Sequence, residues 1–305
     1  MSNYKWLACA SLVACSAPQT ASSPAEFVGL PPFGAPAVMF APGVISTNDV
    51  FASTFTPDGR TVVFTKFSPP KPMTLMSSTF TNGNWSTPTV LPFSGTFRDL
   101  DPAFSPDGNR LYFSSGRPSG PSLADTTTGV DTWYVDRVGS GWGTPIRFSE
   151  PVNSVETDMY PSVTRRGVLY FDSFRQQPRR LVYRAEPRDD GTLSTPQLLD
   201  VAVNSDSGAS NLFVDADERF VVFGARRPDG AGGSDLYLSW KTPTGWTTPR
   251  NLGAQVNTPA VEFCPFVSRD GRYLYFTRVV TLADQRQERN VFVVRFDDIA
   301  ERLKP

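Results

Sequence analysis

Histidine is absent from this chain of 305 residues. Its absence excludes Ser-His-Asp and Cys-His catalysis, zinc bound through imidazole, and an imidazole general base. Lysine is scarce as well, because 24 of the 29 basic residues are arginine, and the net charge is −1. A chain without a strong positive field is not expected to bind nucleic acid, and the bias to arginine favours planar ion pairs over a diffuse basic patch.

Cysteine is also rare, and one of the three cysteines has a telling position. Cys15 ends an apolar run that a single lysine precedes, and a segment rich in Ser, Pro and Ala follows it. The run is too short to span a bilayer as a helix and has the layout of a secretory signal. Leu12-Val13-Ala14-Cys15 resembles the lipobox of bacterial lipoproteins. The resemblance implies that residues 1–14 are a signal peptide, that Cys15 is lipidated, and that residues 15–32 form a lipid-anchored flexible linker. The alternatives are an ordinary signal peptide and an apolar tail with two incidental cysteines.

The same resemblance gives an expected location. Ser16 is similar to the residue that directs lipoproteins to the outer membrane. We therefore expect an outer-membrane lipoprotein of the bacterial cell envelope that faces the periplasm or the cell surface and touches the membrane only through its lipid anchor. Processing would leave Cys264 as the single internal thiol, which is expected to be a small buried side chain without a disulfide.

A repeat of about 50 residues runs through the remainder of the chain. Its landmark is an alternating strand ending in phenylalanine, and this residue recurs at Phe64, Phe113, Phe171, Phe223 and Phe276. An Asp-Gly pair precedes three of these strands and predicts a tight hairpin turn. Another strand follows, and then a segment containing proline, which is expected at the outer edge of a sheet because proline cannot donate to a ladder. Repeats of this length with strand-like content predict an all-β fold, a β-propeller with four antiparallel strands in each blade.

Two stretches resemble a known repeat type. Pro102-Ala103-Phe104-Ser105-Pro106-Asp107-Gly108 with Leu111-Tyr112-Phe113, and Ser234-Asp235-Leu236-Tyr237, are similar to the TolB-like, WD-like β-propeller repeat of bacterial envelope proteins. The resemblance covers residues 49–296 and implies a fold, whereas function must come from a site.

The ends of the repeat array predict how the ring closes. The last unit lacks its proline-containing strand, and residues 34–40 match such a strand, as a comparison with residues 143–148 shows. We expect residues of about 34–45 to supply the fourth strand of the last blade, within a single propeller domain of residues 33–305. This arrangement gives five blades; six is the alternative.

Charged side chains recur at equivalent places in the repeat. Acids precede the first strand and bases follow the second, which places both near one mouth of the central channel. The candidate funnel or ligand-binding residues are Asp99, Asp101, Asp158, Glu262, Arg117, Arg175, Arg227 and Arg278. Structural ion pairs between acid and arginine are the favoured interpretation, and a polar funnel that binds a glycan, a peptide or a cation is the other.

No motif in the chain indicates a cofactor, a nucleotide or a metal ion. The favoured function is a non-enzymatic, envelope-anchored propeller that binds or scaffolds an envelope protein or a glycan. The alternatives are a glycan-active hydrolase that uses the funnel carboxylates and a purely structural envelope component.

Overall fold

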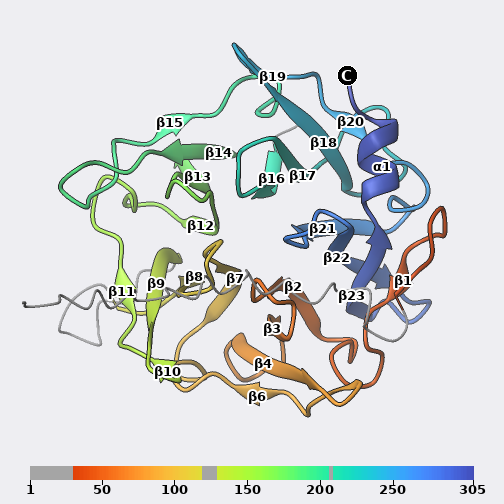
Figure 1. The fold of residues 1–305 in the computed structure, drawn as a ribbon, viewed down its shortest axis with the longest axis horizontal. Coiled ribbons are helices and arrows are strands. Elements are labelled where there is room, and N and C mark those ends of the chain that lie inside the picture. Colours follow the sequence, from red (N-terminus) through yellow and green to blue (C-terminus); the bar gives the residue numbers. More distant parts are fainter. Residues whose placement is uncertain (1–29, 119–128, 206–208) are drawn as a thin grey trace, which may run out of the picture.

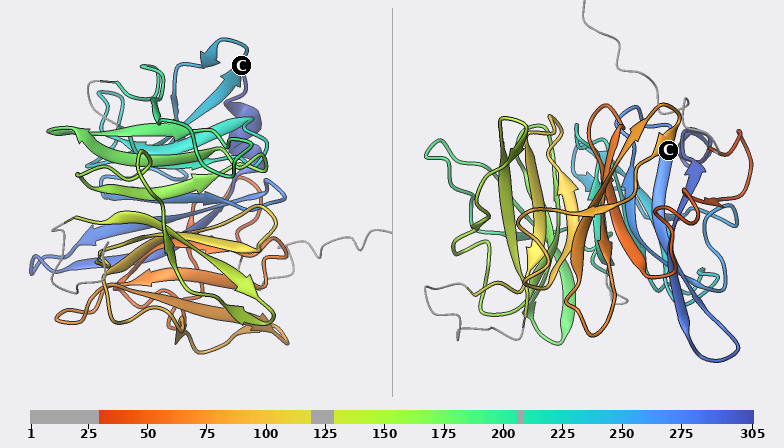
Figure 2. Two further views of the ribbon diagram at one scale, coloured as in Figure 1. Left: turned by 90° about the vertical axis from the view of Figure 1, so that its left-hand side faces the viewer. Right: turned by 90° about the horizontal axis from the view of Figure 1, so that it is seen from below.

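The computed structural model describes residues 30–118, 129–205 and 209–305, which form five antiparallel sheets around a central axis (Figure 1). The side views show that the strands run along this axis, so that loops gather at both ends of the ring (Figure 2). The fold is therefore the predicted all-β propeller, and it has five blades.

Each blade is built from successive strands, ordered from the axis outward. Blade 1 contains β2 (Val50–Phe55), β3 (Thr61–Lys66), β4 (Thr74–Thr81), β5 (Asn84–Trp85) and β6 (Thr89–Val90). Blade 2 contains β7 (Asp99–Phe104), β8 (Arg110–Ser115), β9 (Asp131–Val138), β10 (Gly141–Trp142) and β11 (Ile146–Arg147). Blade 3 contains β12 (Asp158–Val163), β13 (Leu169–Gln176), β14 (Arg179–Ala185) and β15 (Gln197–Leu198). Blade 4 contains β16 (Ala209–Val214), β17 (Phe220–Ala225), β18 (Asp235–Thr242), β19 (Gly245–Trp246) and β20 (Arg250–Asn251). Blade 5 contains β21 (Val261–Val267), β22 (Tyr273–Thr281), β23 (Gln287–Arg295) and β1 (Val38–Met39).

The N-terminal strand β1 closes the ring, as predicted. It pairs antiparallel with β23, with Val38 opposite Val293 and Met39 opposite Phe292. The next residue, Phe40, donates its N–H to the carbonyl of Val291 at 2.8 Å. A blade assembled from both ends of the chain ties those ends together and covers a sheet edge.

The outer strands are short because proline interrupts them. In blades 1, 2 and 4 the fourth strand is split into two pieces of two residues each. Pro88, Pro145 and Pro249 lie between the pieces, where the missing N–H prevents a continuous ladder. The proline-containing segments are thus outer edges, as expected from the sequence.

The hairpin turns between the first and second strands share one backbone conformation. The glycines of four turns have positive φ: 70° at Gly59, 76° at Gly108, 81° at Gly167 and 73° at Gly271. At Gly108 a Cβ atom would lie 2.7 Å from Cδ of Pro57, so no larger residue fits there without movement. Blade 4 has Glu218 at this position with φ of 57°. The side chain of Glu218 accepts hydrogen bonds from Arg166 at 2.9 Å and from the hydroxyl of Tyr170, which hold the left-handed conformation.

Asparagines of the connections between blades hold the third strands. In each of three connections one side-chain amide accepts a hydrogen bond from the backbone N–H of a third-strand residue and donates one to the carbonyl of the same residue. The pairs are Asn153 with Thr132, Asn204 with Val182, and Asn257 with Leu236, at 2.8–3.0 Å. Ser46 bonds both groups of Val291 in the same way, at 3.1–3.2 Å. The recurrence of asparagine in these connections is therefore explained by backbone pairing.

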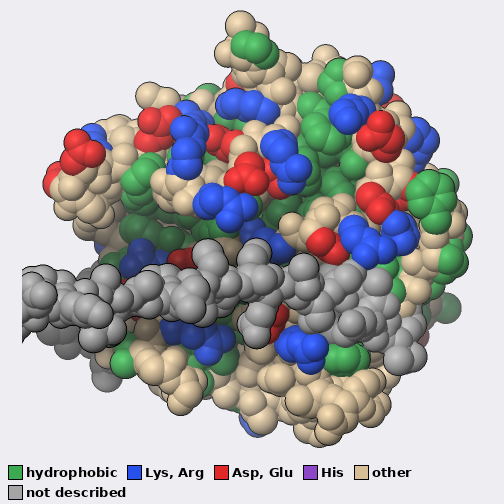
Figure 3. All heavy atoms as spheres, viewed as in Figure 1, with side chains coloured by type: hydrophobic (Ala, Val, Ile, Leu, Met, Phe, Trp, Pro, Cys, Tyr) green, Lys and Arg blue, Asp and Glu red, His purple; other side chains and the backbone are tan. Residues whose placement is uncertain are grey.

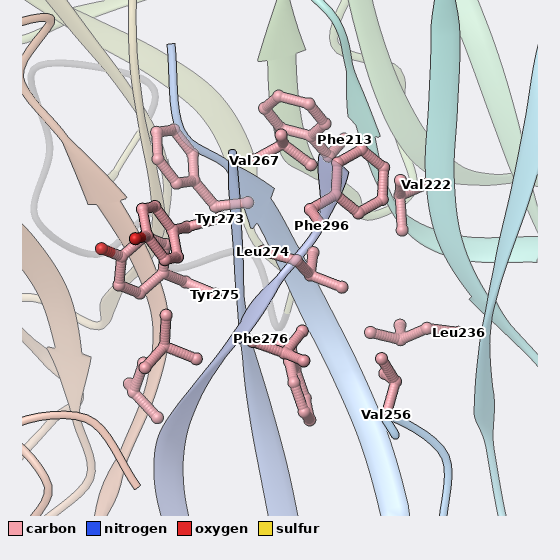
Figure 4. Packing of buried hydrophobic residues seen from close by; sticks show 14 of the residues in the cluster. Phe213, Val222, Leu236, Val256, Val267, Tyr273, Leu274, Tyr275, Phe276 and Phe296 are labelled. Atoms are coloured by element: carbon pink, nitrogen blue, oxygen red, sulfur yellow. The ribbon is translucent and has the colours of Figure 1, made fainter. Parts of the chain in front are cut away.

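The hydrophobic core lies between the blades. One cluster joins blades 4, 5 and 1, and Figure 4 shows how its side chains from β16, β17, β18, β21 and β22 interlock. Three further clusters fill the spaces between blades 3 and 4, 1 and 2, and 2 and 3. The five repeat phenylalanines are at most 1% exposed. Each blade buries both of its faces against neighbours, which is why the repeats are stable only as a ring.

A short helix follows the last strand and was not expected. The helix α1 (Asp297–Arg302) begins with two aspartates and ends with an arginine, an order that suits the helix dipole. Ile299 is fully buried in the cluster between blades 4, 5 and 1. The indole N–H of Trp240 donates to the carbonyl of Leu303 at 3.0 Å, which fixes the end of the helix against blade 4. Within the described residues, no helix has the length and apolar character needed to cross a membrane.

Candidate functional site

Three of the four candidate acids are held in ion pairs within their own blades. Asp99, Asp158 and Glu262 lie at the beginnings of β7, β12 and β21, and each is 0% exposed. The ion pairs are Asp99–Arg117 at 3.1 Å, Asp158–Arg175 at 2.8 Å and Glu262–Arg278 at 2.7 Å. Hydroxyl groups donate further hydrogen bonds to these carboxylates: Ser94 and Ser115 to Asp99, Ser154 to Asp158, and Thr258 to Glu262. Burial raises the pKa of Asp99, and Arg117 partly opposes this effect.

The arginines of these pairs also hold the connections between blades. Arg175 donates to the carbonyl of Val152 at 2.6 Å and Arg278 to that of Val256 at 2.7 Å, and Arg117 bonds the carbonyl of Phe93. Their guanidinium groups lie 5.0–5.5 Å from the rings of the repeat phenylalanines Phe113, Phe171 and Phe276. A buried pair of this kind fixes backbone geometry and leaves its carboxylate few free lone pairs for a ligand, although Nη1 of Arg117 is buried without a partner among the described residues.

Arg227 is the corresponding residue of blade 4. It bonds the carbonyls of Ala202 and Val203 at 3.1 and 3.3 Å and lies 5.8 Å from the ring of Phe223. Asp206, the acid that precedes β16 in the sequence, lies outside the described residues, and so does the expected lipidation site Cys15.

Asp101 occupies a different environment, on the axis of the ring. Every first strand contains a bulge at which the register to the second strand shifts. The residue at the bulge has a φ of 47–55° in all five blades: Ala52, Asp101, Tyr160, Asn211 and Cys264. The N–H of Asp101 donates to Thr65 Oγ1 of blade 1 at 3.1 Å, and that of Tyr160 donates to Ser114 Oγ of blade 2 at 3.0 Å. These bulges turn buried side chains toward the channel, where side chains of different blades meet.

Asp101 belongs to a polar group in the channel, which we call the channel cluster: Asp101, Tyr160, Asp172, Arg180 and Cys264. Asp172 Oδ2 accepts hydrogen bonds from Arg180 and, at 2.8 Å, from the N–H of Asn211. The other oxygen, Oδ1, is buried without a partner among the described residues. The side chain of Arg180 is 26% exposed, whereas that of Asp172 is 0% exposed. In the channel cluster the guanidinium of Arg180 is therefore partly accessible, whereas the carboxyl groups of Asp101 and Asp172 are buried.

The titration of Asp101 follows from this burial. Loss of hydration raises the pKa of Asp101 to about 7, Arg180 acts in the opposite direction, and Asp172 adds to the rise. Burial also raises the pKa of Asp172, and of Tyr160 and Cys264, whose side chains therefore stay neutral. Cys264 is a free cysteine and 1% exposed, as expected.

Apolar side chains, which we call the apolar collar, pack with Tyr160 and Cys264 of the channel cluster on the side of the loops that join second and third strands. Phe51, Leu100 and Val130 are buried there, and Phe51 stacks on Phe263 with ring centroids 6.1 Å apart. The collar also includes the partly buried side chains Phe67, Met73 and Met159. Such a mouth can exclude water around a ligand that Arg180 recognises. In the described part of the chain no group of three or more acidic, cysteine or histidine side chains is placed to hold a metal ion.

Asp172 and Arg180 were not identified from the sequence. Their signal was a departure from the repeat. The position of Asp172 is taken by Thr65, Ser114, Gly224 and Thr277 in the other blades. The residues that recur in the repeat are those of the ion pairs within blades, whereas the charge of Asp172 occurs in one blade only.

Comparison with known proteins supports the fold. No family model matches the chain, and no curated protein matches it either. A solved structure of TolB from Agrobacterium tumefaciens is 14% identical with a TM-score of 0.52, and the match covers 83% of this chain and 79% of that one. The chain shares its propeller fold with TolB.

A solved glycosidase also shares the fold. The alpha-L-arabinofuranosidase of Podospora anserina, solved in complex with cellotriose, is 11% identical with a TM-score of 0.53, over 86% of this chain and 94% of that one. TolB from Acinetobacter baumannii is 16% identical with a TM-score of 0.46, and the match covers 80% of this chain and only 54% of that one. A TolB structure and a glycosidase are thus both among the structural neighbours, and identities this low show the fold alone.

Proposed function

We propose that this protein is a non-enzymatic β-propeller of the bacterial cell envelope that binds an envelope protein or a glycan at the mouth of its channel. The observation that carries the proposal is the locking of Asp99, Asp158 and Glu262 by arginines of their own blades. Carboxylates held in buried ion pairs and hydrogen bonds have few lone pairs left for a substrate. At the mouth of the channel, the partly exposed Arg180 and the apolar collar can instead bind a ligand.

The surface supports a specific site over a general field. Figure 3 shows Lys and Arg side chains interspersed with Asp and Glu on the face toward the viewer, in keeping with the net charge of −1. Attraction of polyanions over a wide surface is therefore not part of the proposal. We also propose that a lipid on Cys15 anchors the protein to the outer membrane, so that it faces the periplasm or the cell surface.

A pull-down tests the binding function. The tagged full chain, wild type or Arg180→Met, is incubated with native envelopes and with a glycan array, and bound material is identified by mass spectrometry or fluorescence. We expect the same ligand to be lost with Arg180→Met and retained with Arg250→Met, which removes an equal charge from the exposed outer strand β20. Capture that Arg180→Met leaves intact contradicts the assignment to the channel mouth.

The anchor has its own test. Cys15→Ser should move the protein from the membrane fraction to the soluble fraction of disrupted cells. An unchanged membrane fraction contradicts the lipid anchor, and it leaves the binding function untouched.

A glycan-active hydrolase is the second candidate. The pKa of Asp101, raised to about 7, favours it, because a group with this pKa can donate or accept a proton near neutral pH. Turnover of aryl glycosides or polysaccharides that disappears with Asp101→Asn and persists with Asp284→Asn, an exposed surface variant, would replace the binding function as the conclusion.

A further inference from the structure

A small cavity lies in the channel between the bulges and the hairpin turns. Its volume is about 30 Å³, roughly the space of one water molecule. Residues from all five first strands line it, and neither aspartate nor glutamate is among them. The polar side chains at this cavity are Ser53, Thr54, Tyr160, Ser162 and Arg269.

Arg269 is the one cationic side chain that lines the cavity. It belongs to the hairpin turn of blade 5 and reaches across the channel, where Nη2 donates to the carbonyl of Phe104 at 3.2 Å. Its Nε is buried without a partner among the described residues, and Arg269 takes part in none of their ion pairs. Burial lowers the pKa of Arg269 to about 10, and the nearby guanidinium of Arg165 acts in the same direction. Within the described part of the chain no carboxylate pairs directly with this charge, and Asp215, Asp107 and Asp217 oppose the lowering of the pKa of Arg269 from farther away.

The hydroxyl groups around Arg269 are available as donors. Thr54 Oγ1 accepts the N–H of Phe104 at 3.1 Å, and Ser162 Oγ accepts the N–H of Val214 at 2.9 Å. A hydroxyl that accepts in this way keeps its hydrogen for another acceptor. Ser53 Oγ is buried and has no partner among the described residues. Among the described residues, the cavity is therefore lined by a half-buried cation and by hydroxyl donors, and no carboxylate lines it.

We propose that this cavity binds one small monovalent anion of the size of chloride. The anion neutralises Arg269 and accepts hydrogen bonds from the hydroxyls of the surrounding strands. Because these groups come from blades 1, 3 and 5, the bound anion holds the first strands together at the turn side of the ring. This site lies on the far side of the bulges from the apolar collar, and it does not depend on the function proposed for the channel mouth.

Thermal unfolding of the full chain in chloride-free buffer tests the site. Sodium chloride, bromide, sulfate or gluconate is added at constant ionic strength. Chloride and bromide should each raise the melting temperature by about 2 °C or more once they exceed their dissociation constant tenfold. Gluconate should leave the melting temperature unchanged, and sulfate should raise it only through its general exclusion from the protein surface, by the same amount in wild type and in Arg269→Gln.

Variants locate the effect. Arg269→Gln should abolish the response to chloride, and Arg250→Gln, which removes an exposed charge on β20, should keep it. Should Arg269→Gln fail to fold, Ser53→Ala and the broadening of the ³⁵Cl resonance by the wild-type protein, reversed by bromide, provide the measurement. Equal effects of all four salts, or a chloride response that survives Arg269→Gln, would overturn the site and indicate a buried water molecule in its place.

Discussion

Phe40 is the residue on which closure of the ring depends most directly. It follows β1, is 4% exposed, and contacts the rings of Phe55, Trp85 and Tyr275 edge-on at centroid distances of 5.6, 5.5 and 5.1 Å. Truncation of a buried phenylalanine to alanine costs about 3–5 kcal/mol, the aromatic contacts included. Since each kcal/mol changes the melting temperature of a large domain by about 2–4 °C, Phe40→Ala should lower it by about 6–20 °C.

The free energy of unfolding of Phe40→Ala and of a control variant is measured by urea unfolding, followed by tryptophan fluorescence, and the melting temperature is measured by calorimetry. The matched control is Phe33→Ala, because Phe33 precedes the same strand and is 72% exposed; its free energy of unfolding should change by less than about 0.5 kcal/mol. A loss below about 1 kcal/mol for Phe40→Ala, or equal losses for the two variants, would refute the view that the N-terminal segment stabilises the ring by packing.

Two further predictions concern buried charge. Glu262→Gln leaves Arg278 without its carboxylate and should lower the free energy of unfolding, measured by urea titration, by about 3–5 kcal/mol. The control is Asp284→Asn, because the side chains of the Asp284–Arg286 pair are more than half exposed; it should cost less than about 1 kcal/mol. Asp101 has a pKa of about 7 in the folded protein against an ordinary value of 3.8, so the folded state holds a proton that the unfolded state loses between these values. Its contribution to stability is complete below about pH 4 and falls by up to about 4 kcal/mol as the pH rises to 7. Asp101→Asn should remove this part of the pH dependence, and identical pH profiles of wild type and variant would contradict the assignment.

Much of the fold could be read from the chain because its determinants are local and repeated. The Asp-Gly pairs set the turns, and proline set the outer edges. Even the closing strand was found, since residues 34–40 carry the same pattern as the outer strands of other blades. The C-terminal helix was not predicted, because six residues are too few to show a helical periodicity.

The candidate site was predictable only in its repeated part. Pairing of Asp99, Asp158 and Glu262 with arginine was the favoured interpretation, and the structure forms those pairs. The channel cluster depends instead on left-handed bulges, which no residue pattern marks, since alanine, aspartate, tyrosine, asparagine and cysteine all occupy that conformation.

Spacing and composition along the chain thus indicate the blades and their turns, because these rest on contacts within about 50 residues. The number of blades stayed open between five and six until the pairing of β1 with β23 showed five. Only closure of the ring decides which side chains share the channel. Asp101, Asp172 and Cys264 come from three blades and meet because five bulged strands converge on one axis. The raised pKa of Asp101 and the lowered pKa of Arg269 arise in the same way, since both result from burial that neighbouring blades impose.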